Sequence, residues 1–427
     1  MEANEGYRAR IADGLLSQAM GAMGAVQVVG PKWCGKTTTA QQVCRSAIYF
    51  QDPDQRASLL GLAAEKPSLL LKSAQPILLD EWQDAPQIWD AVRFAVDQDA
   101  TPGQFVLTGS TVVRPENRDL IRHSGTGRFA KVRMRPMSLS ESGDSNGGVS
   151  LASLFDGAAV EATSPLGLED IARLILQGGW PAAVNARGSA GRAGWAPRDY
   201  VDSIADADIS RVDGIEKNPN RVRLLLRSLA RNESTAAKMT VLQADMAAAG
   251  GTISINTITG YLSALRGLYV LEEQQPWAGA VRSRVVQRAA PVRRYADPSI
   301  LAAILGLSED KLLTDFNTFG CLFESLVVRD LRCYAEAGDA EVFYYHDLRG
   351  LECDAIIERR DGAWGAVAIK LAASQAQAAK ANLSAIRDKV RSQHGGQASF
   401  LLVVTNTPHA YQDADGVYYV PLGCLKP

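Results

Sequence analysis

Residues 30–37 read GPKWCGKT and match the pattern G-x-x-x-x-G-K-[ST] of a phosphate-binding loop. The glycines let the backbone curl so that successive N–H groups point at phosphates, and the lysine supplies a compact positive charge. The apolar stretch AVQVVG at residues 25–30 precedes the loop as a predicted strand, and residues 36–48 follow it as a predicted helix. This helix would add the positive end of its dipole. The stretch therefore predicts a nucleotide-binding loop in an α/β sheet.

The predicted nucleotide ligands are the residues of this loop and of the helical turn after it: Gly30, Pro31, Lys32, Trp33, Cys34, Gly35, Lys36, Thr37 and Thr38. Lys36 is expected to contact the β- and γ-phosphate oxygens of ATP and to take part in catalysis. The hydroxyl of Thr37 is expected to bind Mg²⁺. The alternative is a tight glycine turn that carries an ordinary exposed lysine.

Residues 77–81 read ILLDE, an apolar strand that ends in two carboxylates. Asp80 is expected to hold Mg²⁺ through water, and Glu81 is expected to orient or deprotonate the attacking water. A strand end with two solvated acids is the alternative. Beside a phosphate-binding loop, the pair of acids favours hydrolysis over nucleotide binding alone.

Two further stretches contain candidate catalytic residues. The strand at 105–108 leads into FVLTGS, which places Thr108 and Ser110 at the strand tip; Thr108 is expected to sense the γ-phosphate or to position water. An ordinary strand-end turn is the alternative. Arg128 ends HSGTGR and is a candidate arginine finger, acting in cis or from a neighbouring subunit.

Together these stretches resemble AAA-type P-loop ATPases, and more narrowly the prokaryotic ATPases in which an AAA domain precedes a C-terminal domain of unknown function. The matching stretches are GPKWCGKTT, ILLDEWQDAP, FVLTGS, HSGTGRFAKVRMRPMSLSESG, GGWP, SLARNES, TITGYLSALRGLYVLEEQQPW, YADPSIL and LFESLVVRDL. The resemblance implies an α/β fold with an AAA-type parallel sheet at residues 1–190. It implies a helical linker and winged-helix-like domain at 191–297 and a small α/β domain similar to PD-(D/E)xK nucleases at 298–427. ATP and Mg²⁺ are the implied cofactors.

A nuclease of this type needs two carboxylates on adjacent strands to hold Mg²⁺, and a lysine beside the second one. The candidate residues are Glu324 in LFESL, Asp354 in GLECDAIIE and Lys370 in GAVAIKLA. Ala368 stands where the pattern has Glu or Asp, and this removes a metal ligand. Glu352 and Glu358 share the strand face of Asp354 and are possible substitutes. We therefore expect a degenerate nuclease-like site.

A helix–turn–helix pattern precedes this domain. Residues 242–249 form the first predicted helix, Gly250 and Gly251 the turn, and Ser254 the N-cap of a second helix that runs to Arg266. A strand at 268–272 is predicted after it, as the first strand of a wing. The second helix places polar side chains at Asn256, Thr257, Thr259, Ser263 and Arg266, which could face a groove of DNA.

Residues 274–296 form a stretch that carries five arginines and no acid. The arginines are Arg282, Arg284, Arg288, Arg293 and Arg294. Such a run is a possible contact for the phosphate backbone of DNA. A solvated face or a protein contact is the alternative.

Composition limits the class of protein. The 427 residues include 45 Lys+Arg and 47 Asp+Glu, so the formal net charge of −2 excludes a histone-like or polyacidic binder but not a local basic patch. No apolar run has the length of a membrane span, and the N-terminus lacks the apolar core of a secretory signal. Six cysteines without a C-x-x-C pair, and four histidines, favour the reducing cytoplasm and make a zinc site improbable.

These observations predict Mg²⁺-dependent ATP binding and hydrolysis, with the nucleotide state coupled to a C-terminal module that binds DNA or another partner. Two alternative functions remain at this stage. One is a nucleotide-controlled assembly scaffold without a nucleic-acid role, and the other is an active metal-dependent nuclease. The sequence leaves the oligomeric state open.

Overall fold

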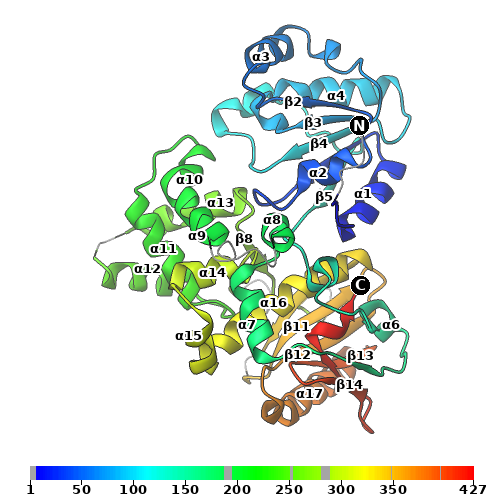
Figure 1. The fold of residues 1–427 in the computed structure, drawn as a ribbon, viewed down its shortest axis with the longest axis vertical. Coiled ribbons are helices and arrows are strands. Elements are labelled where there is room, and N and C mark those ends of the chain that lie inside the picture. Colours follow the sequence, from blue (N-terminus) through cyan, green and yellow to red (C-terminus); the bar gives the residue numbers. More distant parts are fainter. Residues whose placement is uncertain (1–5, 187–194, 251–252, 280–288, 348, 395) are drawn as a thin grey trace. The chain divides into compact units, whose positions relative to one another are not determined.

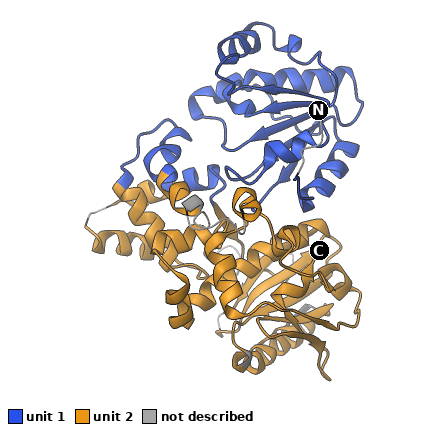
Figure 2. Cartoon of the chain, viewed as in Figure 1, with its two compact units in different colours: residues 1–136, 203–219, 260–270 blue, residues 137–202, 220–259, 271–427 orange. Residues whose placement is uncertain are grey.

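The computed structural model describes residues 6–186, 195–250, 253–279, 289–347, 349–394 and 396–427. The chain forms two compact units (Figure 2). Unit 1 contains residues 1–136, 203–219 and 260–270, and unit 2 contains residues 137–202, 220–259 and 271–427. These units group the chain differently from the predicted domains at 1–190, 191–297 and 298–427, and that three-part division stays a prediction.

Unit 1 contains a five-stranded parallel sheet (Figure 1). Its strands are β1 (Ala25–Val29), β2 (Ser46–Tyr49), β3 (Ile77–Asp80), β4 (Phe105–Gly109) and β5 (Phe129–Arg133). They lie in the order β2-β3-β4-β1-β5, and every neighbouring pair is parallel. Strand β4 therefore separates β1, which leads into the phosphate-binding loop, from β3, which ends in the two acids. The predicted α/β class with a parallel central sheet is confirmed.

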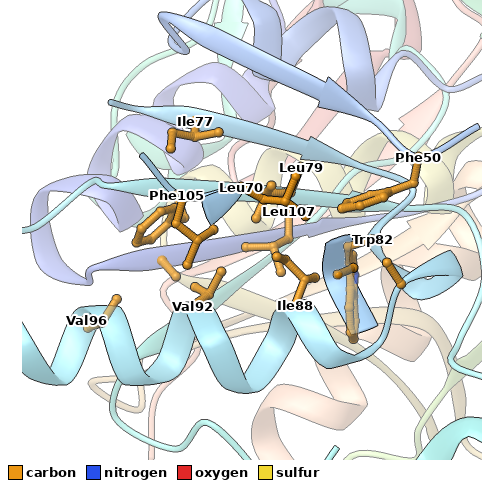
Figure 3. Packing of buried hydrophobic residues seen from close by; sticks show 14 residues of the cluster. Phe50, Leu70, Ile77, Leu79, Trp82, Ile88, Val92, Val96, Phe105 and Leu107 are labelled. Carbon is orange, nitrogen blue, oxygen red and sulfur yellow. The ribbon is translucent and has the colours of Figure 1, made fainter. Parts of the chain in front are cut away.

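Helices cover both faces of this sheet. Successive side chains of a strand point to opposite faces, so the continuous apolar runs of the central strands place apolar side chains on both faces, and both must be buried. The helices are α1 (Ile11–Ala22), α2 (Lys36–Gln41), α3 (Arg56–Glu65) and α4 (Gln87–Gln98). On one face, Ile77, Phe105 and Leu107 pack with Ile88 and Val92 of α4 (Figure 3). On the other face, the alternate strand residues pack with α1 and α2. The phosphate-binding loop is thus attached to a sheet that is buried on both sides.

Two strands of this sheet differ from the expectation. The helix predicted at 36–48 ends at Gln41, and Ser46–Tyr49 form β2 instead. β2 and β5 are the edge strands of the sheet. All four residues of β2 are only partly buried, and β5 carries basic residues between its apolar ones. Neither strand has the continuous apolar run that marks the central strands.

A helical stretch and a two-stranded sheet follow in the sequence. Its elements are α9 (Trp195–Ser203), the π-helix η4 (Ile204–Asp208), α10 (Ile209–Arg211), α11 (Pro219–Arg231), α12 (Met239–Ala248), α13 (Ile255–Gly267), β8 (Leu271–Gln274) and β9 (Val292–Tyr295). The predicted N-cap is confirmed, because the Ser254 hydroxyl accepts a hydrogen bond from the Thr257 N–H at 3.1 Å. The predicted strand at 268–272 begins later, because Tyr269 has a left-handed φ of 58°. Gly251 of the predicted turn lies outside the described residues.

Unit 2 contains a seven-stranded mixed sheet in the order β10-β11-β12-β13-β15-β14-β7. Its strands are β7 (Ala162–Thr163), β10 (Ala340–His346), β11 (Glu352–Arg359), β12 (Trp364–Ile369), β13 (Phe400–Thr405), β14 (His409–Gln412) and β15 (Val417–Pro421). The accompanying helices are α5 (Leu139–Ser142), α6 (Leu151–Phe155), α7 (Leu168–Gln177), α8 (Pro181–Asn185), α14 (Pro298–Leu305), α15 (Glu309–Thr314), α16 (Phe316–Ala337) and α17 (Ala376–His394). The short strands β6 (Val149–Ser150) and β16 (Leu425–Lys426) pair with each other.

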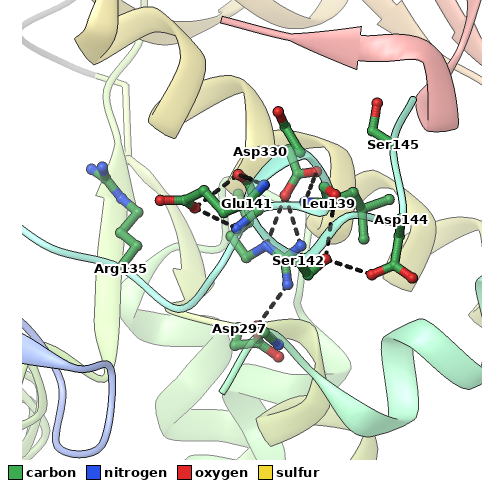
Figure 4. Close-up of polar contacts among 12 residues, drawn as sticks. Arg135, Leu139, Glu141, Ser142, Asp144, Ser145, Asp297 and Asp330 are labelled. Carbon is green, nitrogen blue, oxygen red and sulfur yellow. Dashed lines mark hydrogen bonds and ion pairs between the residues drawn. The ribbon is translucent and has the colours of Figure 1, made fainter. Parts of the chain in front are cut away.

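A buried ion-pair network joins distant segments of unit 2 (Figure 4). The Arg329 guanidinium of α16 contacts the Asp297 carboxylate at 2.8 Å and the Asp330 carboxylate at 2.7 Å. Asp330 also accepts from the Leu139 N–H at 3.0 Å, and Asp297 accepts from the Gly179 N–H at 3.0 Å. Four of the stretches that carry the resemblance therefore meet at this network. They are RMRPMSLSESG, GGWP, YADPSIL and LFESLVVRDL.

The six cysteines are free thiols, and Cys321 is the exposed one. Burial raises the pKa of the Cys44 thiol to about 12, so this side chain stays protonated at neutral pH. Within the described ranges, no helix has both the length and the apolar character needed to cross a membrane. The cytoplasmic location stays a prediction.

Candidate functional site

The phosphate-binding loop has the backbone conformation that its glycines permit. Gly30 has φ of 159°, and a Cβ at this position would lie 2.1 Å from the Met134 carbonyl oxygen, so only glycine fits. Gly35 is in the left-handed region with φ of 100° and is the residue before the first residue of α2. Trp33 also has a positive φ, of 66°, and its side chain is exposed. The loop thus ends at a helix N-terminus, where backbone N–H groups favour anions.

Lys36 and Thr37 occupy the first turn of α2. Lys36 is buried, and its ammonium donates to the Pro31 carbonyl oxygen at 2.8 Å within the same loop. The Thr37 hydroxyl donates to Asp80 Oδ1 at 2.7 Å. Thr38 follows on the helix, and its carbonyl oxygen accepts from the Gln42 side chain at 2.9 Å. The predicted loop residues therefore lie together, with the lysine held next to the loop backbone.

An arginine that was not identified from the sequence, Arg10, holds the backbone of the phosphate-binding loop. Arg10 is 6% exposed and donates to the Cys34 carbonyl oxygen at 2.8 Å and to the Arg135 carbonyl oxygen at 2.7 Å. Its backbone N–H donates to the Asp13 carboxylate at 2.7 Å, in the first turn of α1. No sequence motif marks Arg10, because its partners lie 24 and 125 residues away. This contact fixes one loop carbonyl, and so helps to set the direction of the loop N–H groups.

A third loop contact involves a lysine that the sequence did place in the site. The Lys32 ammonium forms an ion pair with Asp208 at 2.7 Å, and the Asp208 side chain is only 8% exposed. Asp208 is the last residue of the π-helix η4. π-Helices are rare in proteins, and those that occur often lie at functional sites. Asp208 is a contact that sequence reasoning missed, since nothing in its local pattern distinguishes it.

Two hydroxyl groups meet the Asp80 carboxylate at the carboxyl edge of the sheet. Thr37 donates to Asp80 Oδ1 at 2.7 Å, and the fully buried Thr108 donates to the same oxygen at 2.5 Å. Thr108 comes from β4, which pairs with β3 at the Asp80–Thr108 position. Oxygen ligands of this kind suit Mg²⁺, which takes few protein ligands and completes its shell with water and phosphate. The arrangement therefore fits the predicted metal residues Thr37 and Asp80.

Glu81 follows β3 in a strained conformation. Its φ of 53° lies in the left-handed region, which costs a non-glycine residue roughly 1–2 kcal/mol. Its Oε2 accepts from the Ser110 hydroxyl at 3.0 Å and from the Gln83 side-chain amide. The predicted base is thus held beside Asp80 and the loop by donors from β4's end and from its own turn. Gln83 was not among the residues singled out from the sequence.

The structure does not bring Arg128 to this site. Arg128 precedes β5, whose first residue Phe129 pairs with Ala25 at the start of β1. The phosphate-binding loop follows Val29, four residues further along β1, which is about 13 Å at the ~3.3 Å rise of a parallel strand. Arg128 instead pairs with Asp97 at 2.7 Å, and this hydrogen bond lowers the pKa of Asp97. In this arrangement Arg128 lies away from the loop of its own chain, and its role as an arginine finger, in cis or from a neighbouring subunit, stays a prediction.

The predicted nuclease-like residues do lie close together in unit 2. The Lys370 ammonium contacts Asp354 Oδ2 at 3.0 Å, and the Ile369 N–H donates to the same oxygen at 2.6 Å. Although burial alone would lower it, the neighbouring Asp354 and Glu324 carboxylates raise the pKa of Lys370. Burial raises the pKa of Glu324, which is next to Asp354 as well. The lysine is therefore a fixed cation at this cluster.

A second cation at this cluster corrects the expectation for the arginine run. Arg294 is 2% exposed, and its guanidinium contacts Glu324 Oε1 at 2.6 Å. Arg293 is also buried and pairs with Glu273 at 3.6 Å. Neither side chain is available as a surface contact for DNA phosphates, because both are committed to internal carboxylates. Arg282, Arg284 and Arg288 lie outside the described residues.

A third carboxylate belongs to the same cluster. Glu233 is 3% exposed and accepts from the Ser325 hydroxyl at 2.7 Å. Burial raises the pKa of Glu233 to about 7, with Arg294 as the main opposing influence. Among the described residues, no set of three or more His, Cys, Asp or Glu side chains has an arrangement that could hold a metal ion. The two cations therefore offset the charge of the acids from within the protein.

The possible substitutes for the missing carboxylate lie on β11 with Asp354. Ala368, which stands where the pattern has Glu or Asp, is buried in β12. Glu358 is four residues from Asp354, about 13 Å along the strand, and its pKa is raised mainly by burial. Glu352 is exposed at the other end of the strand. Glu358 is thus too distant to complete a site at Asp354.

Known families match three separate parts of the chain. An AAA domain matches residues 23–143, and a domain of unknown function (DUF8612) matches residues 168–311. A second domain of unknown function (DUF4143) matches residues 319–425. The first match contains the phosphate-binding loop, Asp80, Glu81 and Thr108. The last one contains Glu324, Asp354 and Lys370.

Two similar proteins align with most of the chain. Uncharacterized proteins of Mycobacterium bovis and Mycobacterium tuberculosis are each 24% identical to it over 347 residues, which cover 80% of this chain and 69% of each relative. Among solved structures, a Walker-type ATPase of Pyrococcus abyssi is 13% identical, with a TM-score of 0.43. That match covers 71% of this chain and 97% of the other. A score this low supports no assignment of residues.

Proposed function

We propose that this chain, an AAA-type ATPase with a C-terminal domain of unknown function (DUF4143), binds ATP with Mg²⁺ at the carboxyl edge of its parallel sheet and hydrolyses it. The observation that carries the proposal is the Asp80 carboxylate. It accepts hydrogen bonds from two hydroxyl groups. The Thr37 hydroxyl, from the phosphate-binding loop, donates at 2.7 Å, and the Thr108 hydroxyl, from the neighbouring strand β4, donates at 2.5 Å. The acidic residue Glu81 follows it directly. One edge of the sheet thus combines an anion cradle, oxygen ligands and a base.

The roles of the residues follow from their chemistry. The loop N–H groups and Lys36 would bind the phosphates, and Lys36 would exchange its bond with the Pro31 carbonyl for phosphate oxygens. Thr37 and Asp80 would hold Mg²⁺, which neutralises phosphate charge when bound. Glu81 would accept the proton of the attacking water. Thr108, tied to Asp80, would keep that carboxylate oriented.

Glu81→Gln is expected to retain ATP but to lose hydrolysis. The amide keeps the size of the side chain and cannot accept a proton, and loss of a general base costs about 10²- to 10⁴-fold in rate. Single-turnover hydrolysis should fall by about this factor, while the Kd for ATP, measured by calorimetry, changes little.

The matched control is Glu65→Gln, the same exchange at an exposed position at the end of α3. This variant should hydrolyse ATP at the parental rate. If Glu81→Gln turned over ATP like the parent protein, the assignment of Glu81 as the base would be wrong.

For the C-terminal module we propose a role without DNA cleavage. Arg294 and Lys370 contact the Glu324 and Asp354 carboxylates, so the acids that would hold Mg²⁺ in a nuclease are paired with the protein's own cations. Ala368 supplies no further ligand. An inserted Mg²⁺ would have to displace charge pairs that are already formed.

Supercoiled plasmid DNA incubated with the protein and Mg²⁺ or Mn²⁺ is therefore expected to remain intact, as judged on agarose gels. Cleavage that disappears in Asp354→Ala would overturn this role. The same incubation, with ATP added, reports on the partner class. Hydrolysis that DNA accelerates, with an effect lost at higher salt, would support a DNA partner.

The surface we propose for such a partner is the outer face of α13. Asn256, Thr259, Ser263 and Arg266 are exposed there, as the sequence pattern suggested. Because Arg293 and Arg294 are buried and Thr257 is only partly exposed, these four side chains are the exposed part of the predicted DNA contact among the described residues. An ATPase rate that does not respond to DNA would instead favour a protein partner or nucleotide-controlled assembly.

A further inference from the structure

The turn that follows β3 is held in place on its outer side. Residues Trp82–Asp84 form one turn of 3-10 helix, η2, and the Asp84 N–H donates to the Glu81 carbonyl oxygen at 3.0 Å. The Asp84 carboxylate accepts from the Arg56 guanidinium at 2.8 Å. The same guanidinium donates to the Phe50 carbonyl oxygen at 3.1 Å. The turn therefore has a fixed course, and it directs the side chain of its middle residue back towards Glu81.

That middle residue is Gln83, which is buried with 8% exposure. Its Nε2 donates to Glu81 Oε2, the oxygen that also accepts from the Ser110 hydroxyl at 3.0 Å. The Ser110 N–H lies 3.4 Å from this oxygen as well. Two side chains therefore hold one oxygen of the carboxylate. This leaves Oε1 without a hydrogen bond from the described residues, so it is the oxygen that can accept a proton.

The other end of the Gln83 amide has no partner. Gln83 Oε1 is buried and makes no hydrogen bond within the described part of the chain, and the same holds for Trp82 Nε1. A buried amide oxygen without a partner costs about 1–3 kcal/mol. The amide nevertheless keeps the orientation in which its N–H group points at Glu81. The Gln83 amide thus keeps its hydrogen bond to the Glu81 carboxylate, although its own oxygen accepts none.

Gly109 at the end of β4 makes room for this amide. A Cβ on Gly109 would lie 2.7 Å from Gln83 Oε1 and 3.4 Å from Trp82 Nε1. An alanine there would force the Gln83 side chain to move, and the amide is the far end of a flexible chain. The backbone of Gly109 does not require glycine for its own sake, since its φ is not among the positive values. The absence of a side chain at 109 therefore serves the position of Gln83.

From these contacts we infer that Gln83 is a positioning residue for Glu81: its amide and the Ser110 hydroxyl hold one carboxylate oxygen so that the other faces the attacking water. The inference rests on the proposed function of Glu81 as the base. Gln83 itself contacts neither ATP nor water in this role. It acts by removing the rotational freedom of a side chain that stands on a strained backbone.

The test is Gln83→Met, which keeps the length of the side chain and removes the N–H donor. Loss of a hydrogen bond to a charged group should lower kcat for ATP hydrolysis by about 10- to 100-fold. The KM and the Kd for ATP should stay within about twofold of the parent values, because the phosphate-binding loop is untouched. Gln51→Met is the matched control: Gln51 is exposed and lies 3.5 Å from Asp84 of the same turn, but does not contact Glu81. Its kcat should equal that of the parent protein.

Gly109→Ala provides an independent route to the same effect. If this substitution acts by displacing Gln83, it lowers kcat on its own but has no further effect in the Gln83→Met background. The effects in this double-mutant cycle should thus be far from additive. Additive effects would show that Gly109 and Gln83 act separately and would overturn the part of the inference that links them.

Failure of the inference is distinguishable from failure of the proposed function. A parent protein that hydrolyses ATP, a Glu81→Gln variant that does not, and a Gln83→Met variant equal to the parent would refute the inference alone. A Gln83→Met variant faster than the parent would also refute it, because Gln83 would then restrain Glu81. A parent protein without ATP hydrolysis would refute the proposed function itself.

Discussion

Lys36→Ala is expected to weaken ATP binding by at least about 100-fold, or about 3 kcal/mol, because it removes charged hydrogen bonds to the phosphates. Lys36 is the only side chain of the loop that is both buried and cationic among those described, and its ammonium already lies against the loop backbone at 2.8 Å from the Pro31 oxygen. Isothermal titration calorimetry with ATP and Mg²⁺ measures the loss directly. Hydrolysis should fall below detection at ATP concentrations that saturate the parent protein.

The control for this variant is Lys66→Ala, which removes an exposed lysine just after α3. It should leave both the Kd for ATP and the rate of hydrolysis unchanged. The thermal transition of Lys36→Ala should be recorded in parallel, because the variant also loses the bond that closes the loop. ATP binding by Lys36→Ala at the parental affinity would contradict the assignment of the loop.

Arg329→Met is expected to have the largest effect on stability. The guanidinium is fully buried and lies between the Asp297 and Asp330 carboxylates, which are themselves 0% exposed. Removal of one partner of a buried ion pair leaves uncompensated charge and costs about 3–5 kcal/mol. The substituted chain also loses the point at which four segments of unit 2 meet. Urea denaturation followed by circular dichroism should show an earlier transition for unit 2.

The control has the same substitution at an exposed ion pair. Arg360 contacts Asp339 at 2.9 Å, with 84% and 68% of the two side chains exposed. Pairs of this kind contribute about 0–1 kcal/mol, so Arg360→Met should denature like the parent protein. Equal effects of the two substitutions would show that burial of the Arg329 network does not determine its contribution.

The loss in free energy of unfolding caused by Arg329→Met should also depend on pH. Burial raises the pKa of Asp330, and Arg329 is the main influence that opposes this rise. Without the arginine, the folded state favours the protonated carboxyl more strongly than the unfolded state does. A group with a raised pKa in the folded state loses its stabilising contribution as pH increases above the unfolded value. The difference in stability between variant and parent should therefore be smaller near pH 5 than at pH 7.

The sequence predicted those features that depend on local patterns. The phosphate-binding loop, the strand that ends at Asp80 and the strand that carries Thr108 are all found where the pattern places them. Each has a continuous apolar run, a motif of fixed spacing or a capping residue, so a short window contains the whole signal. The edge strands β2 and β5 have no such signal, because only part of their surface is buried.

Features that depend on distant partners could not be predicted in this way. Arg293 and Arg294 lie in an acid-free run, but Glu324, which pairs with Arg294, comes 30 residues later. The contact of Arg10 with the loop depends on residues further away still. Arg128 has the residue type of an arginine finger, yet parallel pairing places it at the amino edge of the sheet. The residue type shows which contacts an arginine can make, whereas burial and strand order decide which partner it contacts.

The division of the chain into its units has a practical consequence. The polypeptide passes from one unit to the other after residues 136, 202, 219, 259 and 270. No single truncation therefore yields a complete unit 1, since a fragment that stops at residue 136 would lack the segment that carries Asp208. A protease that cuts once between the units should nick the protein without releasing a stable fragment. Recombination that exchanges the C-terminal half between relatives would have to preserve all of these crossings together.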